Sequence, residues 1–198
     1  MRFNYLLVLV FVSSLFFGFP INLNAQEIPE QIVSVKDYDR TACLYTSYEG
    51  LVMAGYQGWF SAASDGAKRG WHHYEKNGEF KPGMSTIDFW PDVSEYKITY
   101  ETAFQFANGD KAKVYSPYDE SSVDLHFKWM KDYGIDGVFM QRFVSEIKSP
   151  QGKKHFNKVL ENALKAAKKY KRAICIMYDL SGCTSDELEI VADDWKEL

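Results

Sequence analysis

Residues 134–144 read GIDGVFMQRFV, an apolar run with no regular polar face. Such a run is typical of a strand that is covered on both faces in a parallel sheet. A helix that begins at Ser149 and Pro150 follows, because apolar side chains recur every three or four positions from Phe156 to Ala167. Residues 172–182, RAICIMYDLSG, form another buried strand. Strand, helix and strand in this order predict parallel pairing through a right-handed crossover.

Two further strands are predicted upstream of this unit. Residues 51–60, LVMAGYQGWF, are apolar and rich in strand formers, and residues 112–116, AKVYS, form a shorter run. Ser121, paired with Asp124, marks the start of a helix that separates the shorter run from residues 134–144. Strand and helix therefore alternate through the second half of the chain.

A third helix is predicted after the last strand, where Thr184 and Glu187 form a capping box. Four buried strands with amphipathic helices between them predict an α/β fold, namely the first half, about four β/α units, of a (β/α)8 TIM-type barrel. A closed barrel of this kind needs about 250 residues. Because residues 26–198 hold four such strands, we expect the natural chain to continue beyond Leu198.

The first 25 residues have the features of a cleavable signal peptide. Arg2 precedes an apolar segment from Leu6 to Phe17, which is shorter than the roughly 20 residues needed to span a bilayer, and a cleavage region follows that ends at Ala25. The mature protein is therefore expected to begin near Gln26. We expect it to be secreted or periplasmic, with no membrane attachment after cleavage, and residues 26–198 to form the barrel part.

Charge and cysteine content argue against several classes of protein. A formal net charge of −4 offers no basic surface for nucleic acid. The three cysteines, Cys43, Cys175 and Cys183, are too few and too scattered for a disulfide framework. A small open-sheet domain that binds phosphates is also disfavoured, because no strand is followed by a glycine-rich turn of the dinucleotide or P-loop kind. No cofactor is expected.

Polar and aromatic residues stand where each predicted strand ends. Parallel α/β folds bind their ligands at the carboxyl ends of the strands. Candidate substrate-binding residues at these ends are Tyr56, Gln57, Trp59, Asp119, Gln141, Arg142 and Tyr178. Asp179 is the catalytic candidate, because it precedes the residues that cap the next helix and its carboxylate suits hydrogen bonding to sugar hydroxyls or proton transfer. Asp119 has the alternative role of capping the helix that follows it.

The irregular segment between residues 61 and 110 is rich in aromatic residues, which suits a binding loop. Its candidate binding residues are Trp71, His72, Tyr74, Asp88 and Trp90. Flat indole and phenol faces next to hydrogen-bonding edges match the alternating faces and hydroxyls of a pyranose. Packing of the aromatic residues into a local core beneath the loop is the alternative reading, equally consistent for Trp90.

The adjacent histidines His72 and His73 also raise the question of a metal ion. Neighbouring side chains on an extended chain are expected to diverge, and no third ligand stands at a recognisable spacing. We therefore predict no metal site here.

Five motifs follow one another along the chain: VMAGYQGWF, GWHHY, DFWPDVSEY, the segment from Ser116 to Phe143, and RAICIMYDLSG. Together they resemble the family 99 and family 71 group of glycoside hydrolases. The resemblance covers nearly all of the mature chain. It points especially to bacterial members related to endo-α-mannosidases, some of whose relatives carry the label xylosidase or arabinosidase.

The resemblance implies a (β/α)8 barrel that cleaves α-glycosidic bonds in mannan-like or glucan-like chains without a metal or organic cofactor. Positions that match the sugar-lining residues of the group are Tyr56, Trp59, Trp71, His72 and Tyr74, the last standing where the mannosidases often have Trp. Asp179 matches a fourth-strand carboxylate that is Glu in the mannosidases. The main catalytic glutamates of the group belong to later strands than those of this chain.

The function predicted from the sequence is that of a secreted glycoside hydrolase acting on an α-linked polysaccharide or oligosaccharide. This chain would supply part of the sugar-binding cleft. The alternative is a catalytically inactive carbohydrate-binding protein or a non-functional fragment. Sequence beyond Leu198 would separate the two, because a hydrolase needs further strands that carry its catalytic glutamates.

Overall fold

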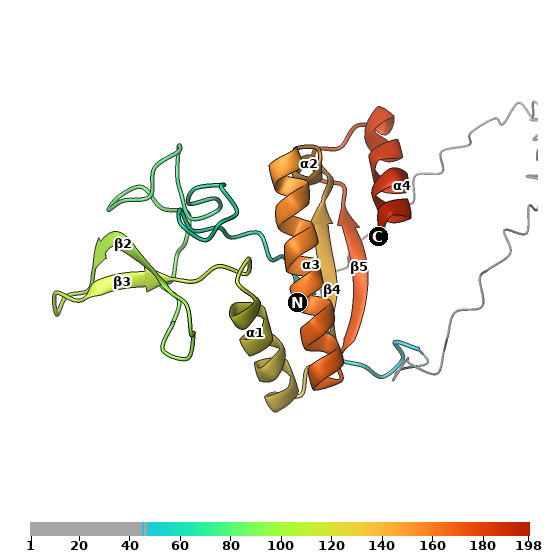
Figure 1. The fold of residues 1–198 in the computed structure, drawn as a ribbon, viewed down its shortest axis with the longest axis horizontal. Coiled ribbons are helices and arrows are strands. Elements are labelled where there is room, and N and C mark those ends of the chain that lie inside the picture. The colour runs from blue at the N-terminus through green and yellow to red at the C-terminus, as the bar shows by residue number, and fades with distance from the viewer. Residues whose placement is uncertain (1–44, 46) are drawn as a thin grey trace, which may run out of the picture. The chain divides into compact units, whose positions relative to one another are not determined.

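The structure, a computed structural model, describes Tyr45 and residues 47–198. The predicted signal peptide lies outside the described residues. The elements, labelled in Figure 1, are β1 (Met53–Tyr56), β2 (Tyr100–Gln105), β3 (Lys111–Val114), α1 (Glu120–Asp132), β4 (Gly137–Phe143), α2 (Val144–Ile147), α3 (Pro150–Tyr170), β5 (Ala173–Asp179) and α4 (Leu188–Glu197). No helix in this part of the chain combines the length and apolarity that a membrane span requires.

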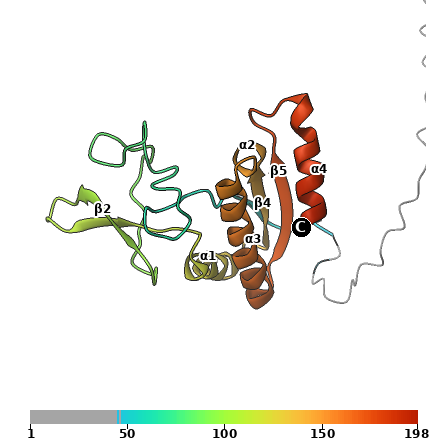
Figure 2. The ribbon, with the colours of Figure 1, turned by 45° about the horizontal axis from the view of Figure 1, so that its top comes forward.

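The central sheet has three parallel strands in the order β1, β4, β5. Met53 of β1 is the register partner of Gly137 of β4, and Gly137 is the partner of Ala173 of β5, so all three strands begin at one level. The predicted parallel pairing of residues 134–144 with residues 172–182 is confirmed. Figures 1 and 2 show α3 lying along β4 and β5, with α1 beside α3.

The second predicted strand does not join this sheet. β3 pairs antiparallel with β2, and the two form a hairpin within the long loop segment (Figure 1). The prediction of a fourth parallel strand at residues 112–116 is therefore wrong. The physical reason is that Val114 is buried with Tyr74 and Phe80 in an aromatic core of its own, away from the parallel sheet. With three parallel strands described, the (β/α)8 architecture stays a prediction.

The main core lies between the sheet and the helices α1 and α3. Its buried apolar residues include Val123, Phe127 and Met130 of α1, Val138 and Met140 of β4, and Val159, Leu160 and Ala163 of α3. Burying one such large side chain contributes about 1.5–3 kcal/mol. Side chains alternate along a strand, so Phe139 and Gln141 lie on the other face of β4, where they are half-buried. Gln141, on this second face, belongs to the candidate site at the strand ends.

Two predicted helix starts are confirmed by their hydrogen bonds. The Ser149 hydroxyl accepts a hydrogen bond from the Gly152 N–H at 3.0 Å, and Pro150 occupies the first turn of α3. Near the start of α4, the Glu187 carboxylate accepts a hydrogen bond from the Thr184 N–H at 2.9 Å. A turn of 3-10 helix separates this pair from α4 itself.

The start of α1 differs from the prediction. The helix begins at Glu120 with Asp119 at its N-cap position, so the predicted cap at Ser121 is wrong. The Asp119 carbonyl already accepts a hydrogen bond from the Ser122 N–H, which starts the helical turn two residues early. Its carboxylate does not cap the helix but accepts a hydrogen bond from the Tyr100 hydroxyl at 2.7 Å.

Replacing Gly137 with alanine is expected to destabilise the sheet. A β-carbon at Gly137 would overlap the backbone oxygen and β-carbon of Ala173 on the neighbouring strand. Relief requires the two strands to separate, so we expect a loss of about 1–3 kcal/mol in the free energy of unfolding. Gly55→Ala is the matched control, because a β-carbon on β1 would meet no heavy atom within 4 Å. Urea unfolding measures both variants, and equal stabilities would contradict the prediction.

Candidate functional site

The carboxyl ends of β4 and β5 bring Gln141 and Asp179 together. Phe143 at the end of β4 is the register partner of Asp179 at the end of β5. The Gln141 amide donates a hydrogen bond to Asp179 Oδ2 at 3.4 Å, and the Ser181 N–H donates to Asp179 Oδ1 at 2.8 Å. Hydrogen bonds from the Ser181 hydroxyl and N–H lower the pKa of Asp179 from its usual value. Asp179 is therefore an ionised acceptor near neutral pH.

Trp59 connects the loop after β1 to these strand ends. Its ring stacks on Phe143 with centroids 5.1 Å apart and on His73 with centroids 4.2 Å apart. The indole is held between the sheet and the loop, half-buried rather than free to rotate. A fixed, half-buried indole therefore stacks on Phe143, the register partner of Asp179.

Glu146 of α2 collects three side chains from the loop after β1. The Nε2 atoms of His72 and His73 each lie 3.0 Å from Glu146 Oε1, and Arg69 forms an ion pair with Glu146 Oε2. The carboxylate is mostly shielded, with 16% of its side chain exposed. The sequence analysis considered only the residues at the end of each strand and so missed Glu146, which stands three positions beyond the end of β4. Including the first helical turn after each strand would have selected it.

The two histidines converge because of the backbone at His73. His73 has a φ of 62°, a left-handed conformation that is uncommon outside glycine. This reversal brings the rings of His72 and His73 to a centroid separation of 4.5 Å and aims both at Glu146. The expectation that neighbouring histidine side chains diverge is therefore wrong here. Non-glycine residues in this conformation cost energy and are concentrated at functional sites.

Glu146 stays ionised in this surrounding. Burial alone would raise its pKa, but hydrogen bonds from His72 and His73 and the charge of Arg69 outweigh that effect and hold the pKa well below its usual range. Burial also lowers the pKa of Arg69, while the Glu146 carboxylate opposes that shift. The pair therefore forms a fixed charge cluster at the strand ends.

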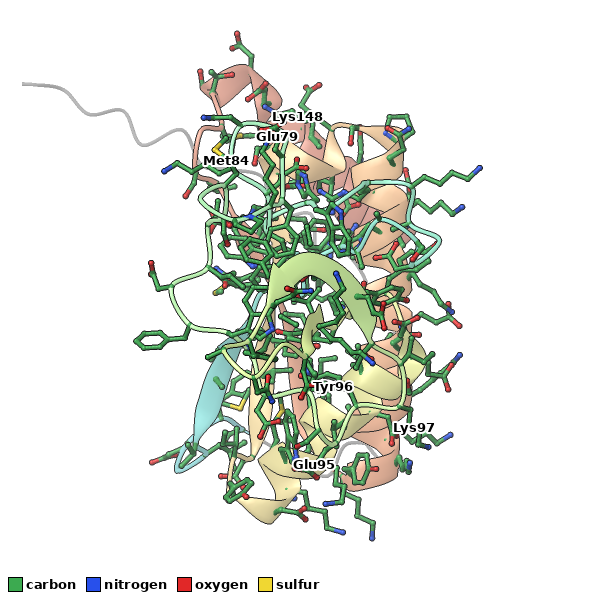
Figure 3. The ribbon with its side chains drawn as sticks, turned by 90° about the vertical axis from the view of Figure 1, so that its left-hand side faces the viewer. Glu79, Met84, Glu95, Tyr96, Lys97 and Lys148 are labelled. Carbon is green, nitrogen blue, oxygen red and sulfur yellow. The ribbon has the colours of Figure 1, made fainter. Side chains whose placement is uncertain are left out.

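A second candidate region is a cavity of about 410 Å³ between β1 and α1. The ring of His126 lies at its wall between two tyrosines. The Tyr56 hydroxyl is 2.7 Å from His126 Nδ1, and the Tyr96 hydroxyl is 2.6 Å from His126 Nε2. Figure 3 shows Tyr96 on the loop that lies near α1. Gln57 and Trp59 also border this cavity.

His126 is neutral in the folded protein. Burial lowers its pKa to about 4. One ring nitrogen then donates to a tyrosine oxygen while the other accepts a hydrogen bond from the second tyrosine. Tyr115 and Trp129 make ring contacts with His126 and extend this aromatic wall. The cavity is largely apolar, with few polar groups to orient a sugar.

Arg142 and Tyr178 both form hydrogen bonds to Asp194 within the fold, and their predicted binding roles stay predictions. Arg142 is 1% exposed, and its Nε and Nη2 atoms donate to the two carboxylate oxygens of Asp194 at 2.7 and 2.6 Å. The Tyr178 hydroxyl donates to the same carboxylate at 2.6 Å. Arg142 points to the opposite face of β4 from Gln141, because side chains alternate along the strand.

Most of the predicted loop residues form the aromatic core around Phe80. Tyr74 is 1% exposed and donates a hydrogen bond to the Tyr115 carbonyl, and its predicted sugar-binding role stays a prediction. Trp71 packs on Phe80, and Trp90 donates to the Lys113 carbonyl at 2.7 Å. The local-core interpretation therefore describes these two indoles. Asp88 is exposed on the same loop.

Comparison with known proteins adds no relative. No protein-family model matches the chain, and neither a curated protein nor a solved structure matches it. The resemblance to the family 99 and family 71 group therefore rests on the sequence motifs. The candidate site has to be interpreted from its own geometry.

Proposed function

We propose that the chain belongs to a secreted glycoside hydrolase of the family 99 and family 71 kind, acting on an α-linked polysaccharide or oligosaccharide. Its part in that enzyme is to line the sugar-binding cleft at the strand ends. The observation that carries the proposal is the placement of Asp179 and Gln141 beside Phe143, on which Trp59 stacks. An indole near an ionised carboxylate and an amide combines the side-chain types that bind a pyranose.

The sequence motifs support the same proposal independently. Trp59 and His72 match sugar-lining positions of the group, and both come to the carboxyl end of the sheet in this structure. Ligands of parallel α/β folds bind at this end. The signal peptide that we expect at residues 1–25 fits a hydrolase of external glycans.

The carboxylates at the strand ends have defined chemical roles under this proposal. Glycoside hydrolysis uses one protonated carboxyl group as acid and one ionised carboxylate as base or nucleophile. The pKa values of Asp179 and Glu146 both lie below their ordinary values. Both groups therefore suit hydrogen bonding or the ionised role. The acid has to be a third carboxyl group.

Sugar binding without hydrolysis is the second candidate function. It is favoured by the low pKa values of Asp179 and Glu146, because neither carboxylate holds a proton near neutral pH and so neither can act as the acid. The two functions share the binding site and differ in turnover. Incubation with α-mannan oligosaccharides and aryl α-mannosides, followed by a reducing-sugar assay, separates them.

Trp59→Ala is expected to weaken binding of an α-linked oligosaccharide about two- to tenfold, because a contact with one aromatic ring contributes about 0.5–1.5 kcal/mol. Isothermal titration with mannan oligosaccharides measures the affinity. Phe106→Ala is the control, since that ring is 47% exposed at the turn of the β2–β3 hairpin. Equal losses in both variants, or no saturable binding by the unaltered chain, would overturn the binding proposal.

Asp179→Asn tests the carboxylate within the same experiment. The amide keeps the size of the side chain but removes its charge, so we expect weaker oligosaccharide binding and, where turnover is present, a loss of hydrolysis. Thermal unfolding checks that the variant is folded. Unchanged binding and turnover in Asp179→Asn would remove this residue from the site.

A further inference from the structure

We propose that His72, His73 and Glu146 bind a divalent transition-metal ion, with Zn²⁺ as the best match. One ligand atom from each residue, a ring nitrogen or a carboxylate oxygen, lies within 4.8 Å of the others. The sequence-based expectation was that no metal binds here, and it assumed that the two rings diverge. The converging rings remove that objection.

The separations of the ligand atoms suit one coordination sphere. Ligands about 2.0–2.2 Å from a Zn²⁺ ion lie roughly 3–3.5 Å from one another. Glu146 Oε1 lies 3.0 Å from the Nε2 atoms of both His72 and His73. The ligand nitrogens of the two histidines lie within 4.8 Å of each other, so two imidazoles and one carboxylate oxygen would take three corners of a tetrahedron once that separation shortens. Small side-chain rotations place an ion between them.

The surrounding residues hold the three ligands in place. Arg69 pairs with Glu146 Oε2 and leaves Oε1 turned toward the histidines. Trp59 stacks on the His73 ring and fixes its plane. Metal-ligating carboxylates and imidazoles are ordinarily held by such outer contacts. The left-handed backbone at His73, costly in itself, is explained by a site that needs both rings.

The position is open on one side. About a third of each histidine side chain is exposed, 34% for His72 and 30% for His73. Three protein ligands with an open fourth position are typical of zinc sites that bind water or substrate, whereas closed structural sites use four. The imidazole ligands select Zn²⁺, Co²⁺ or similar borderline ions over Ca²⁺ and Mg²⁺, which prefer oxygen ligands.

Other groups in the described part of the chain compete poorly for such an ion. The ring of His126 is engaged by two tyrosine hydroxyls, and that of His155 by Ser61 and the Gly58 carbonyl. Cys175 and Cys183 are free thiols and have to be tested directly. Co²⁺ separates the two cases, because thiolate ligands add an intense near-ultraviolet band that imidazole and carboxylate ligands lack.

The test is a titration of the exported chain, purified without a polyhistidine tag, with Zn²⁺ and with Co²⁺. We expect saturation at one equivalent, a rise in the unfolding temperature with Zn²⁺, visible Co²⁺ bands without a thiolate band, and little response to Mg²⁺. His73→Gln and Glu146→Gln should weaken Zn²⁺ binding by about a hundredfold or more. Cys183→Ser and Glu161→Gln, the latter at an exposed ion pair on α3, should leave it unchanged.

The proposal fails if the unaltered chain shows no saturable Zn²⁺ or Co²⁺ binding, or if binding persists in His73→Gln and Glu146→Gln. Saturation that disappears in Cys183→Ser would also overturn it. The unaltered chain gives the decisive spectra, so a variant that does not fold leaves the test intact. No sugar is present in these measurements. Loss of the metal proposal is therefore distinguishable from loss of the glycoside hydrolase proposal.

Discussion

The protein is expected to lose most of its stability between pH 6.5 and pH 4, because two histidines are buried in their neutral forms. Burial lowers the pKa values of His126 and His155 from 6.5 to about 4. In this range the unfolded chain binds more protons than the folded chain, so stability falls as the pH falls. Each histidine contributes up to about 3 kcal/mol to this loss, against a total stability of about 5–15 kcal/mol for an ordinary domain.

The contacts of the two histidines explain why protonation is unfavourable. His155 Nε2 donates to the Gly58 carbonyl at 2.8 Å, and its Nδ1 faces the Ser61 hydroxyl at 3.3 Å. A proton on Nδ1 would turn that acceptor into a donor inside the fold. Protonation of His126 would likewise turn its accepting ring nitrogen into a donor, between the hydroxyls of Tyr56 and Tyr96.

Below about pH 4 the histidines add no further pH dependence, because both folded and unfolded states are then protonated. Glu146 and Asp194 continue the loss at lower pH. Burial opposes ionisation of each, but hydrogen bonds from His72 and Arg142 respectively, with the nearby positive charges, keep both pKa values below the ordinary range. Their stabilisation is present above the unfolded pKa and disappears as the pH falls through the folded one.

Thermal unfolding at pH 7, 5.5 and 4 measures the effect. His126→Gln and His155→Gln keep a donor and an acceptor but cannot be protonated, so each should remove about half of the difference between pH 7 and pH 4. Lys131→Gln, an exposed substitution at the end of α1, is the control and should retain the full dependence. A flat stability profile in the unaltered chain between pH 7 and 4 would contradict the prediction.

Arg142→Ala is expected to destabilise the protein by about 3–5 kcal/mol, the cost of leaving one member of a buried ion pair unpaired. Arg142 and Asp194 both have 2% of their side chains exposed. Without the guanidinium, Asp194 keeps the Tyr178 hydroxyl, and the Lys153 ammonium stays 4.0 Å away. The variant should therefore lose the attachment of α4 to the sheet first.

Urea unfolding compares this variant with Lys165→Ala, which breaks exposed ion pairs with Glu120 and Glu161 and should cost at most about 1 kcal/mol. The double variant Arg142→Met with Asp194→Leu removes both charges and should recover much of the loss. A double variant as unstable as Arg142→Ala would show that the charges are not the cause. Equal stability of Arg142→Ala and Lys165→Ala would refute the prediction itself.

Repeating apolar patterns and helix caps let the sequence alone predict the parallel pairing of residues 134–144 with 172–182 and the start of α3 at Ser149. These features depend on neighbours within a few positions, so local chemistry is sufficient. The local sequence at residues 112–116 does not determine how that strand pairs. It is short, and an antiparallel partner in the loop accommodates it as well as a parallel one.

Only the tertiary structure decided which strand-end residues form a site. Gln141 and Arg142 are adjacent, yet one contacts Asp179 and the other is buried against Asp194, 52 residues away. Glu146 contacts the ring of His73, which stands 73 positions earlier in the sequence. The left-handed backbone at His73 makes this contact possible, and no residue pattern predicts that conformation. Periodicity specifies that a strand has two faces. Which face is covered depends on the free energy of packing segments that are remote in the sequence.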